Sequence, residues 1–190
     1  MTDGTLEMDR KSTAIVVIDL QKGITGRDVK PHSTSVVISN AAKLLKEFRS
    51  RSMPVFLVHV DFRGGIPLNP ISDSVMPRGQ PPEDWAEFVP ELDIAPTDIL
   101  ITKRQWGAFT GTELEQQLRR REITTIVLCG IATTYGVEST ARFAYELGFN
   151  QIFAEDAMTD MSGEAHAASV EYVLKRIGRV RSTQEILQAL

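Results

Sequence analysis

The sequence of 190 residues has almost no cysteine and no long apolar run. Its single cysteine, Cys129, cannot form a disulfide within the chain. Residues 1–11 are polar and lack the apolar core of a signal peptide, and no apolar run approaches the ~20 residues of a membrane-spanning helix. We therefore expect a soluble protein that resides in the cytoplasm.

The chain also lacks a concentration of positive charge, because its formal net charge at pH 7 is -4. Binding to nucleic acid or to an anionic membrane requires a concentrated positive field. The arginines at positions 119–121 lie at the end of a helix-like segment, where cations complement the helix dipole. We therefore expect neither nucleic acid nor a membrane as a partner.

Two nucleotide-binding motifs are missing as well. No Gly-x-Gly-x-x-Gly follows the first apolar run, and no Gly-Lys-Ser/Thr loop occurs anywhere in the chain. The usual dinucleotide and nucleotide ligands of an α/β sheet are therefore excluded, and we expect no cofactor.

Short apolar runs alternate with segments of helical periodicity along the chain. We predict strands at residues 13–19, 54–60, 98–103, 124–129, 151–154 and 179–182. Helices are predicted at 37–48, around Leu114 and Leu118, at 137–148, at 162–177 and at 182–190. This alternation predicts an α/β fold, a Rossmann-like doubly wound and mostly parallel six-stranded sheet with helices on both faces. The length and the 42% of hydrophobic residues suit one domain, 1–190.

Capping residues mark the expected helix ends. Candidate caps are Ser33 or Thr34, Thr110 or Thr112, Gly148, Gly178, and the capping-box pair Ser182 and Glu185. Residues 61–97 break the rhythm, because they carry seven of the nine prolines. We interpret this long insertion as a cover over the site and a subunit contact, with short helical turns near residues 84–88; a mobile surface loop is the alternative.

The stretch 126–148 is a site-building unit: a buried strand, a tight loop at 130–136 and a helix. Amides at such a helix N-terminus stabilise negative charge. Asp19 and Lys103 also fall at the carboxyl ends of predicted strands, where open parallel sheets bind their ligands. Each charge alone could be an ordinary ion-pair partner, whereas the two together with Gly136 favour a functional site.

These motifs resemble the isochorismatase-like hydrolase family, which includes nicotinamidases and carbamoylsarcosine amidohydrolases. Gly130-Ile-Ala-Thr133 and Val137-Glu-Ser-Thr-Ala-Arg142 fit the family pattern around its nucleophilic cysteine, and Gly136 stands in the cysteine's place. Asp19-Leu-Gln21 and Lys103 with Gly107-Ala-Phe109 fit two further motifs. In cysteine-bearing members, the resemblance implies, the Asp takes the thiol proton, the Lys polarises the site, and the thiolate attacks a carbonyl or nitrile-like carbon.

Gly136 cannot act as a nucleophile. Cys129 lies seven positions earlier in an apolar strand and is expected to be inert core, and no base is apparent near the hydroxyls of Thr133, Thr134 or Ser139. Isochorismatases of the family also carry glycine here, and the resemblance implies that they protonate an enol ether through the Asp and then add water. Isochorismate itself is doubtful as substrate, because this loop lacks their Tyr-Ala-His.

The alternative is a catalytically inactive homologue that binds a small ligand or serves as an oligomeric partner. For an acid role Asp19 must hold a proton; burial would raise and the Lys103 cation would lower its pKa, and the sequence leaves the balance open.

The resemblance also implies a small-molecule substrate, a homodimer or larger homo-oligomer, and a cis peptide at Ile131-Ala132. We expect five residues to bind the substrate: Gln21, Trp106, Ala132, Thr133 and Tyr135. Phe109 could join an apolar slot, but core packing is favoured for it. No metal is expected, because His59 and Asp61 have no second histidine nearby and the others are His32 and His166.

Overall fold

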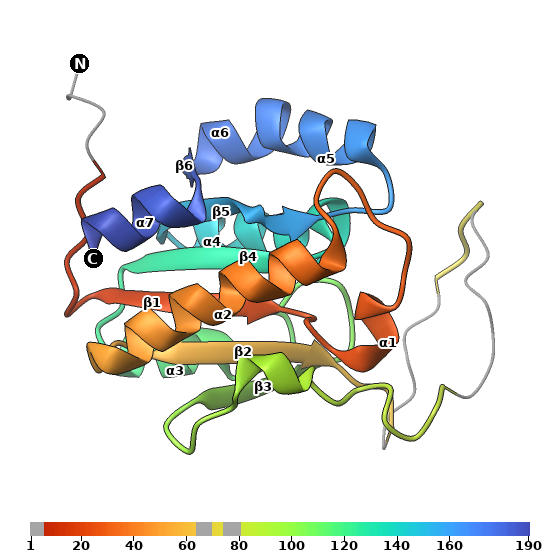
Figure 1. Cartoon of the computed structure of the whole chain (residues 1–190), viewed down its shortest axis with the longest axis horizontal. Helices are drawn as coiled ribbons and strands as arrows, with labels where there is room; N and C mark the ends of the chain where they lie inside the picture. The colour runs from red at the N-terminus through yellow and green to blue at the C-terminus, as the bar shows by residue number, and fades with distance from the viewer. Residues whose placement is uncertain (1–5, 64–69, 74–80) are drawn as a thin grey trace.

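The computed structural model of the chain describes residues 6–63, 70–73 and 81–190 (Figure 1). Six strands form one sheet in the order β3-β2-β1-β4-β5-β6, and every neighbouring pair is parallel. The strands are β1 (Thr13–Ile18), β2 (Val55–Val60), β3 (Ile99–Lys103), β4 (Thr125–Ile131), β5 (Asn150–Thr159) and β6 (Arg179–Arg181). This order confirms the predicted Rossmann-like, doubly wound α/β fold.

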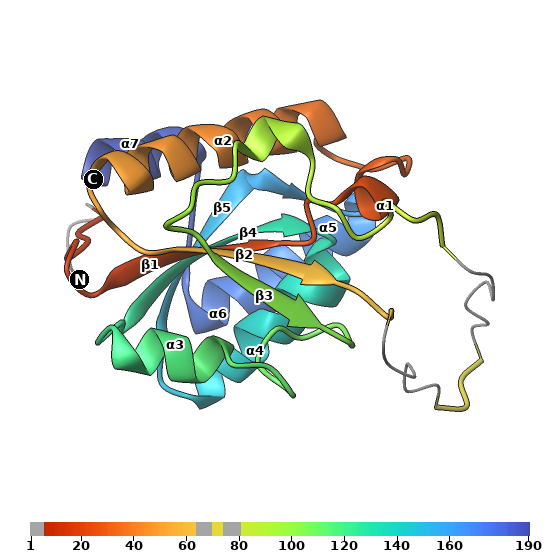
Figure 2. The ribbon, with the colours of Figure 1, turned by 90° about the horizontal axis from the view of Figure 1, so that it is seen from below.

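Helices cover both faces of the sheet, as Figure 2 shows. One face carries α2 (Thr34–Ser50) and α7 (Thr183–Ala189), and the other carries α3 (Leu114–Arg120), α4 (Glu138–Glu146), α5 (Gly163–Ser169) and α6 (Lys175–Ile177). A π-helical turn, η3 (Val170–Leu174), joins α5 to α6, and a short α1 (Lys22–Thr25) follows β1. None of the helices among the described residues is long and apolar enough to cross a membrane.

The helix α2 illustrates how periodicity fixes the packing. Its buried residues are Val37, Ile38, Ala41, Leu44, Leu45 and Phe48, a stripe that faces the sheet at helical spacing. The Ser33 hydroxyl caps the helix, because it accepts a hydrogen bond from the Val36 amide at 3.4 Å. The predicted helix is therefore confirmed, with Ser33 rather than Thr34 as its cap.

The two central strands, β1 and β4, meet where the strand order reverses. Each residue of β1 is buried, and so are all those of β4 after Thr125. Their parallel register pairs Ile18 with Gly130 at the carboxyl end of both strands. In open α/β sheets this switch point is where ligands bind, so the fold puts the end of β1 and the chain after β4 at the expected site.

The sequence-based boundaries of β4 and β5 were wrong. β4 continues through Gly130 to Ile131, and β5 covers Asn150–Thr159 instead of residues 151–154. The pairing of β5 with β4 shifts register between Leu128 and Gly130, which marks a bulge. Glu155 and Asp156 lie in this irregular part, so their charges interrupt the apolar pattern that would have revealed the longer strand.

The helix ends agree with the sequence in part. Gly148 (φ 79°) follows α4 in the left-handed conformation, and Ser182 and Glu185 form the complete capping box of α7. Thr112 accepts a hydrogen bond from the Leu114 amide at 3.2 Å, although α3 begins only at Leu114. Gly178 was predicted as a helix cap, but its φ of -175° is extended. A Cβ there would lie 2.7 Å from the carbonyl oxygen of Gln151, so close packing explains that glycine.

The described part of the insertion lies against the segment after β1. Phe88 forms an isolated antiparallel bridge with Gln21, and Lys22 pairs with Asp84 at 3.1 Å and Glu87 at 2.8 Å. The expected turns are present, since the amides of Trp85 and Glu87 bond to carbonyls three residues earlier, and a 3-10 turn, η1 (Pro90–Leu92), follows. Residues 64–69 and 74–80 of the proposed cover lie outside the described residues, so the cover remains a prediction.

Candidate active site

Asp19 is the first residue after β1. Its φ of 53° is uncommon for a residue other than glycine, although aspartate tolerates it better than most. Its backbone amide donates a hydrogen bond to the carbonyl oxygen of Val58 in β2 at 2.8 Å. The strand and this turn therefore fix the carboxylate at the carboxyl edge of the sheet, where the sequence places it.

Lys103 ends β3 and reaches the same point. Its Nζ lies 2.8 Å from Oδ2 of Asp19. The ammonium also donates to the carbonyl oxygens of Trp106 at 2.8 Å and Gln105 at 3.1 Å. These three acceptors match its three protons, so the ammonium is held in one place.

Burial determines the electrostatics of the pair. Asp19 is 5% exposed and Lys103 is 2% exposed. Loss of solvation raises the pKa of Asp19 to about 6, although the Lys103 cation acts in the opposite direction. The other carboxylate oxygen, Oδ1, is buried and has no hydrogen-bond partner among the residues that the structure describes. Asp19 therefore has one anchored oxygen and one oxygen that can give or take a proton.

Gly136 faces the Asp19–Lys103 pair. A Cβ at this position would lie 3.1 Å from Oδ2 of Asp19, 3.6 Å from Nζ of Lys103 and 2.8 Å from Cγ2 of Ile18. The structure thus brings the three predicted catalytic positions together, and the missing side chain is the one that would have touched both charges. Their roles in a reaction remain predictions.

The loop expected at residues 130–136 is shorter than predicted. After Ile131 only Ala132 intervenes before a π-helical turn, η2 (Thr133–Val137), which continues directly into α4. The amide of Thr134 is already paired, since it donates to Oδ2 of Asp160 at 2.7 Å. The N-terminus of this helix therefore stabilises a carboxylate of the protein itself.

The predicted cis peptide is present between Ile131 and Ala132. Ala132 is 7% exposed. The next residue, Thr133, is fully buried, and its hydroxyl lies 3.1 Å from the carbonyl oxygen of Thr159 and 2.8 Å from Nδ1 of His166. The Thr133 side chain is thus engaged inside the protein, and both residues stay predicted substrate contacts.

Gln21 is buried and binds only protein groups among the contacts that the structure describes. Its amide nitrogen donates to the carbonyl oxygens of Val60 at 3.0 Å and Trp85 at 3.1 Å, and its amide oxygen accepts from the Val60 amide at 2.8 Å. These bonds tie the end of β2 to the insertion. A direct contact between Gln21 and substrate stays a prediction.

Trp106 and Tyr135 pack against each other, and the carbonyl oxygen of Trp106 accepts a hydrogen bond from Lys103. Their ring centroids are 4.8 Å apart in an edge-to-face arrangement, and the two side chains are 51% and 38% exposed. Phe109 is 6% exposed and stacks on Phe149 with a centroid distance of 5.9 Å. Core packing of Phe109 is therefore confirmed, whereas Trp106 and Tyr135 remain accessible to a planar ligand.

Cys129 is fully buried within β4, which confirms it as a core residue. Burial raises the pKa of its thiol to about 12, with a smaller contribution from the charge of Asp156. A thiol in this state carries almost no thiolate near neutral pH. It is therefore unsuited to replace the missing nucleophile.

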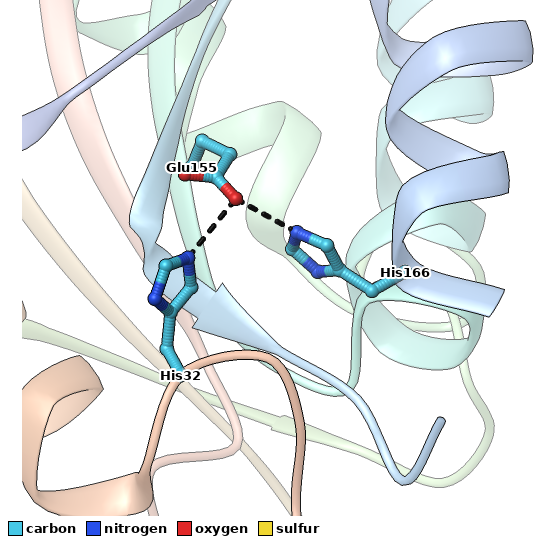
Figure 3. A group of neighbouring side chains, drawn as sticks. All are labelled: His32, Glu155 and His166. Carbon is cyan, nitrogen blue, oxygen red and sulfur yellow. Dashed lines mark hydrogen bonds and ion pairs between the residues drawn. The ribbon is translucent and has the colours of Figure 1, made fainter. Parts of the chain in front are cut away.

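One cluster of titratable side chains was not predicted from the sequence. His32, Glu155 and His166 come from the loop before α2, from β5 and from α5, and they converge on one point (Figure 3). Oε1 of Glu155 lies 3.0 Å from Nε2 of His32 and 2.9 Å from Nε2 of His166. In the sequence, the two histidines are 134 positions apart, so their spacing does not indicate a shared site. The only signal for this cluster was the Glu155-Asp156 pair next to an apolar strand.

Comparisons with known proteins extend over nearly the whole chain. The model of the isochorismatase domain matches residues 13–185. YwoC of Bacillus subtilis (strain 168), an uncharacterized isochorismatase family protein, is 50% identical over 187 residues, covering 97% of each chain. The corresponding protein YecD of Escherichia coli O157:H7 is also 50% identical over 187 residues, covering 97% of this chain and 100% of YecD.

A solved structure gives the same result. An isochorismatase family protein from Burkholderia thailandensis superimposes with a TM-score of 0.94 at 39% identity, covering 98% of this chain and 99% of the other. The superposition therefore covers nearly the whole of both chains.

Proposed function

The chain belongs to the isochorismatase family of hydrolases, and from this premise we propose that it hydrolyses a small molecule without a cysteine nucleophile. In this proposal Asp19 acts as acid and base, and Lys103 is its electrostatic partner. The bond that is cleaved is an enol ether or a similarly activated bond.

One observation carries the proposal: a buried carboxyl whose pKa is raised to about 6 keeps one oxygen on Lys103 and the other unpartnered among the described residues. A general acid works best when its pKa is near the working pH. A carboxyl with an ordinary pKa of 3.8 would be almost fully ionised there. Asp19 has the properties that an acid–base residue requires.

The chemistry that suits this group needs no covalent intermediate. Asp19 gives its proton to the terminal carbon of the enol ether, and the electron pair of the double bond forms the new C–H bond. Water adds to the resulting oxocarbenium carbon and returns a proton to Asp19. The hemiketal then collapses to a carbonyl compound and an alcohol. The overall reaction therefore converts the enol ether and one water into these two products. Gly136 places no side chain beside Asp19, where a Cβ would lie 3.1 Å from Oδ2.

The test is a screen of vinyl ethers, amides and nitriles with the wild type and with Asp19→Asn. Glu122→Gln is the matched control, because Glu122 is an exposed carboxylate before β4, at the opposite edge of the sheet. We expect vinyl ether turnover in the wild type and in the control, and its loss in Asp19→Asn. Equal turnover in all three proteins would disprove the role of Asp19.

Gly136 motivates a second candidate, a non-catalytic homologue that binds a small ligand. The paired Asp19 and Lys103 argue against it, since a buried ion pair is costly to keep where it has no use. This candidate predicts no turnover with any of the compounds but a ligand-dependent rise in melting temperature. A covalent adduct detected by mass spectrometry would instead favour nucleophilic chemistry and contradict both.

Three expectations rest on the sequence and the resemblance: a cytoplasmic location, a homodimer or larger homo-oligomer, and no nucleic-acid partner. Light scattering at several protein concentrations would test the assembly.

A further inference from the structure

The cluster of His32, Glu155 and His166 is separate from the groups of the proposed reaction. The two imidazole Nε2 atoms approach the same carboxylate oxygen, and the ligand atoms of all three residues lie within 4.8 Å of one another (Figure 3). The two rings stand at 86° to each other with centroids 6.0 Å apart. Three potential metal ligands therefore surround one small volume.

We propose that these three side chains form a binding site for a divalent transition metal, with zinc as the best fit. Two imidazole nitrogens and one carboxylate are a donor set that Zn²⁺ uses at 2.0–2.2 Å, typically with a water as the fourth ligand. Mg²⁺ and Ca²⁺ prefer oxygen donors, so the two nitrogens select against them. Only small side-chain movements are required, since the present nitrogen-to-oxygen distances are 2.9 and 3.0 Å.

Solvent access supplies the fourth ligand. The side chains of His32 and Glu155 are 27% and 33% exposed, whereas that of His166 is 3% exposed. The site therefore has a buried wall and an open side. A metal ion can enter from the open side, and a water molecule can complete its coordination there.

Thr133 fixes the orientation of the buried ligand. Its hydroxyl lies 2.8 Å from Nδ1 of His166 and 3.1 Å from the carbonyl oxygen of Thr159. When the hydroxyl donates to Thr159, it accepts a hydrogen bond from Nδ1–H, which leaves the lone pair of Nε2 directed at the metal position. A partner of this kind on the far side of the imidazole is typical of metal-bound histidine.

The same hydroxyl also suits the metal-free state. If the hydroxyl donates to Nδ1 in place of Thr159, Nε2–H of His166 can donate to Glu155. One hydroxyl rotation therefore converts the imidazole from hydrogen-bond donor to metal ligand without a change in its net charge. This reversible arrangement distinguishes the cluster from histidines whose second nitrogen faces solvent.

His32 is held in place through its backbone. The carbonyl oxygen of His32 accepts a hydrogen bond from the Thr159 hydroxyl at 2.7 Å. Two residues earlier, Lys30 and Asp160 exchange backbone hydrogen bonds at 2.6 and 3.0 Å. The loop before α2 is thus attached to the end of β5 at the histidine itself and two residues before it. A metal ion would add a further link between this loop, β5 and α5.

The proposal does not depend on the proposed function, because the cluster contains neither Asp19 nor Lys103. Thr133 belongs to the same π-helical turn as Gly136, so an ion at this position stabilises the turn that faces the reaction site. We infer a structural ion. Loss of hydrolysis and loss of metal binding can therefore be observed independently.

The test uses the tag-free full chain, treated with chelator and titrated with ZnCl₂ in a calorimeter. We expect one Zn²⁺ per chain for the wild type and for His59→Gln, the matched control. His59 bonds to Ala86 and Thr102 and lies outside the cluster. In His32→Gln and His166→Gln the affinity should fall at least tenfold. No binding by the wild type, or unchanged binding by both variants, would refute the site.

Two further measurements separate a metal site from a structural hydrogen-bond cluster. Co²⁺ in a tetrahedral nitrogen and oxygen site gives intense visible absorption, which is expected for the wild type and absent in His32→Gln. Thr133→Val keeps all three ligands but removes the partner of Nδ1, so zinc affinity should fall roughly 10- to 100-fold at unchanged stoichiometry. Unchanged affinity in Thr133→Val would overturn the orienting role. Because His32 is on a half-exposed loop, its variant keeps the test decisive if His166→Gln does not fold.

Discussion

Oδ2 of Asp19 and Nζ of Lys103 meet at 2.8 Å, although the strands that carry them, β1 and β3, are separated by β2. Each side chain leaves the carboxyl end of its strand and extends over the end of β2, so the contact depends on the whole edge of the sheet. Both groups are buried, and each compensates the charge of the other. The stability and the chemistry of this edge are therefore coupled.

We first predict strong energetic coupling between these two residues. Asp19→Asn leaves the Lys103 ammonium buried without its counter-charge and should lower the free energy of unfolding by about 3 kcal/mol at pH 7. Lys103→Met should have a cost of similar size. The double variant Asp19→Asn/Lys103→Met should be more stable than the sum of the single changes indicates, because it leaves no unpaired charge. Urea unfolding of the four proteins measures this, and simple additivity would contradict it.

The raised pKa of Asp19 predicts a pH dependence of stability. The native carboxyl keeps its proton up to about pH 6, whereas in the unfolded chain it releases it near 3.8. Folding therefore takes up a proton within this window, and the free energy of unfolding should decrease as the pH rises from 4 to 6. The size of this decrease is up to about 3 kcal/mol.

The double variant Asp19→Asn/Lys103→Met is the control for that measurement, because neither position titrates in it. Its stability should lack the decrease attributed to Asp19 when both proteins are unfolded by urea at pH 4, 5, 6 and 7. If the free energy of unfolding has the same dependence on pH in both proteins, the pKa of Asp19 is not raised. If turnover is found, it should also decline as the pH passes about 6, since the acid form of Asp19 is lost there.

Much of this site could be predicted from the sequence, for a simple reason. Asp19 directly follows an apolar run, Lys103 follows the short run 99–101 after one threonine, and the carboxyl ends of parallel strands share one edge. Gly136 could be placed because a strand, a short link and a helix follow one another without a gap. Local patterns were sufficient wherever the chain runs directly from a strand into the site.

The rest depends on tertiary contacts that no local pattern contains. His32 and His166 meet Glu155 only because the loop before α2 and the start of α5 both pack on the end of β5. The charge of Glu155 also prevented prediction of the C-terminal part of β5, since this residue lies in a bulge that breaks the apolar run. Gly178 was mistaken for a helix cap because its reason, the nearby backbone of Gln151, is remote in sequence.

Cysteine reactivity gives a further prediction about position 136. The Cys129 thiol, whose pKa is about 12, should not react with a thiol reagent in the folded protein and should react fully in urea. The thiol introduced by Gly136→Cys would lie close to Lys103, and a nearby cation favours the thiolate. We expect it to react with iodoacetamide in the folded state, as shown by peptide mass mapping.

The same substitution has a structural cost that must be measured in parallel. The new Cβ would lie 2.8 Å from Cγ2 of Ile18, so the side chain of Ile18 must move and the free energy of unfolding should fall by roughly 1–3 kcal/mol. Alkylation at Cys129 in the folded wild type would show that its thiol is not buried. No alkylation at position 136 in a folded variant would show that Lys103 does not lie beside it.

The last prediction concerns Gly130, which pairs with Ile18 immediately before Asp19. Its φ is 123°, a region that residues with a side chain rarely adopt. An added Cβ would lie 2.0 Å from the carbonyl oxygen of Ile18 and 2.7 Å from its amide nitrogen. Because these atoms belong to the backbone of β1, no side-chain movement can relieve the contact, and β1 and β4 would have to separate at the site.

Gly130→Ala should therefore cost at least about 3 kcal/mol of unfolding free energy or prevent folding, beyond the range of an ordinary surface change. Gly26→Ala is the matched control, since Gly26 has a φ of -80° and its Cβ would find only the carbonyl oxygen of Lys22 at 3.9 Å. That variant should stay within about 0.5 kcal/mol of the wild type. Urea unfolding distinguishes the two variants. Only the described register of β1 and β4 brings the Ile18 backbone against position 130. A Gly130→Ala protein as stable as Gly26→Ala would therefore show that the strands do not have the register that sets Asp19 beside Gly136.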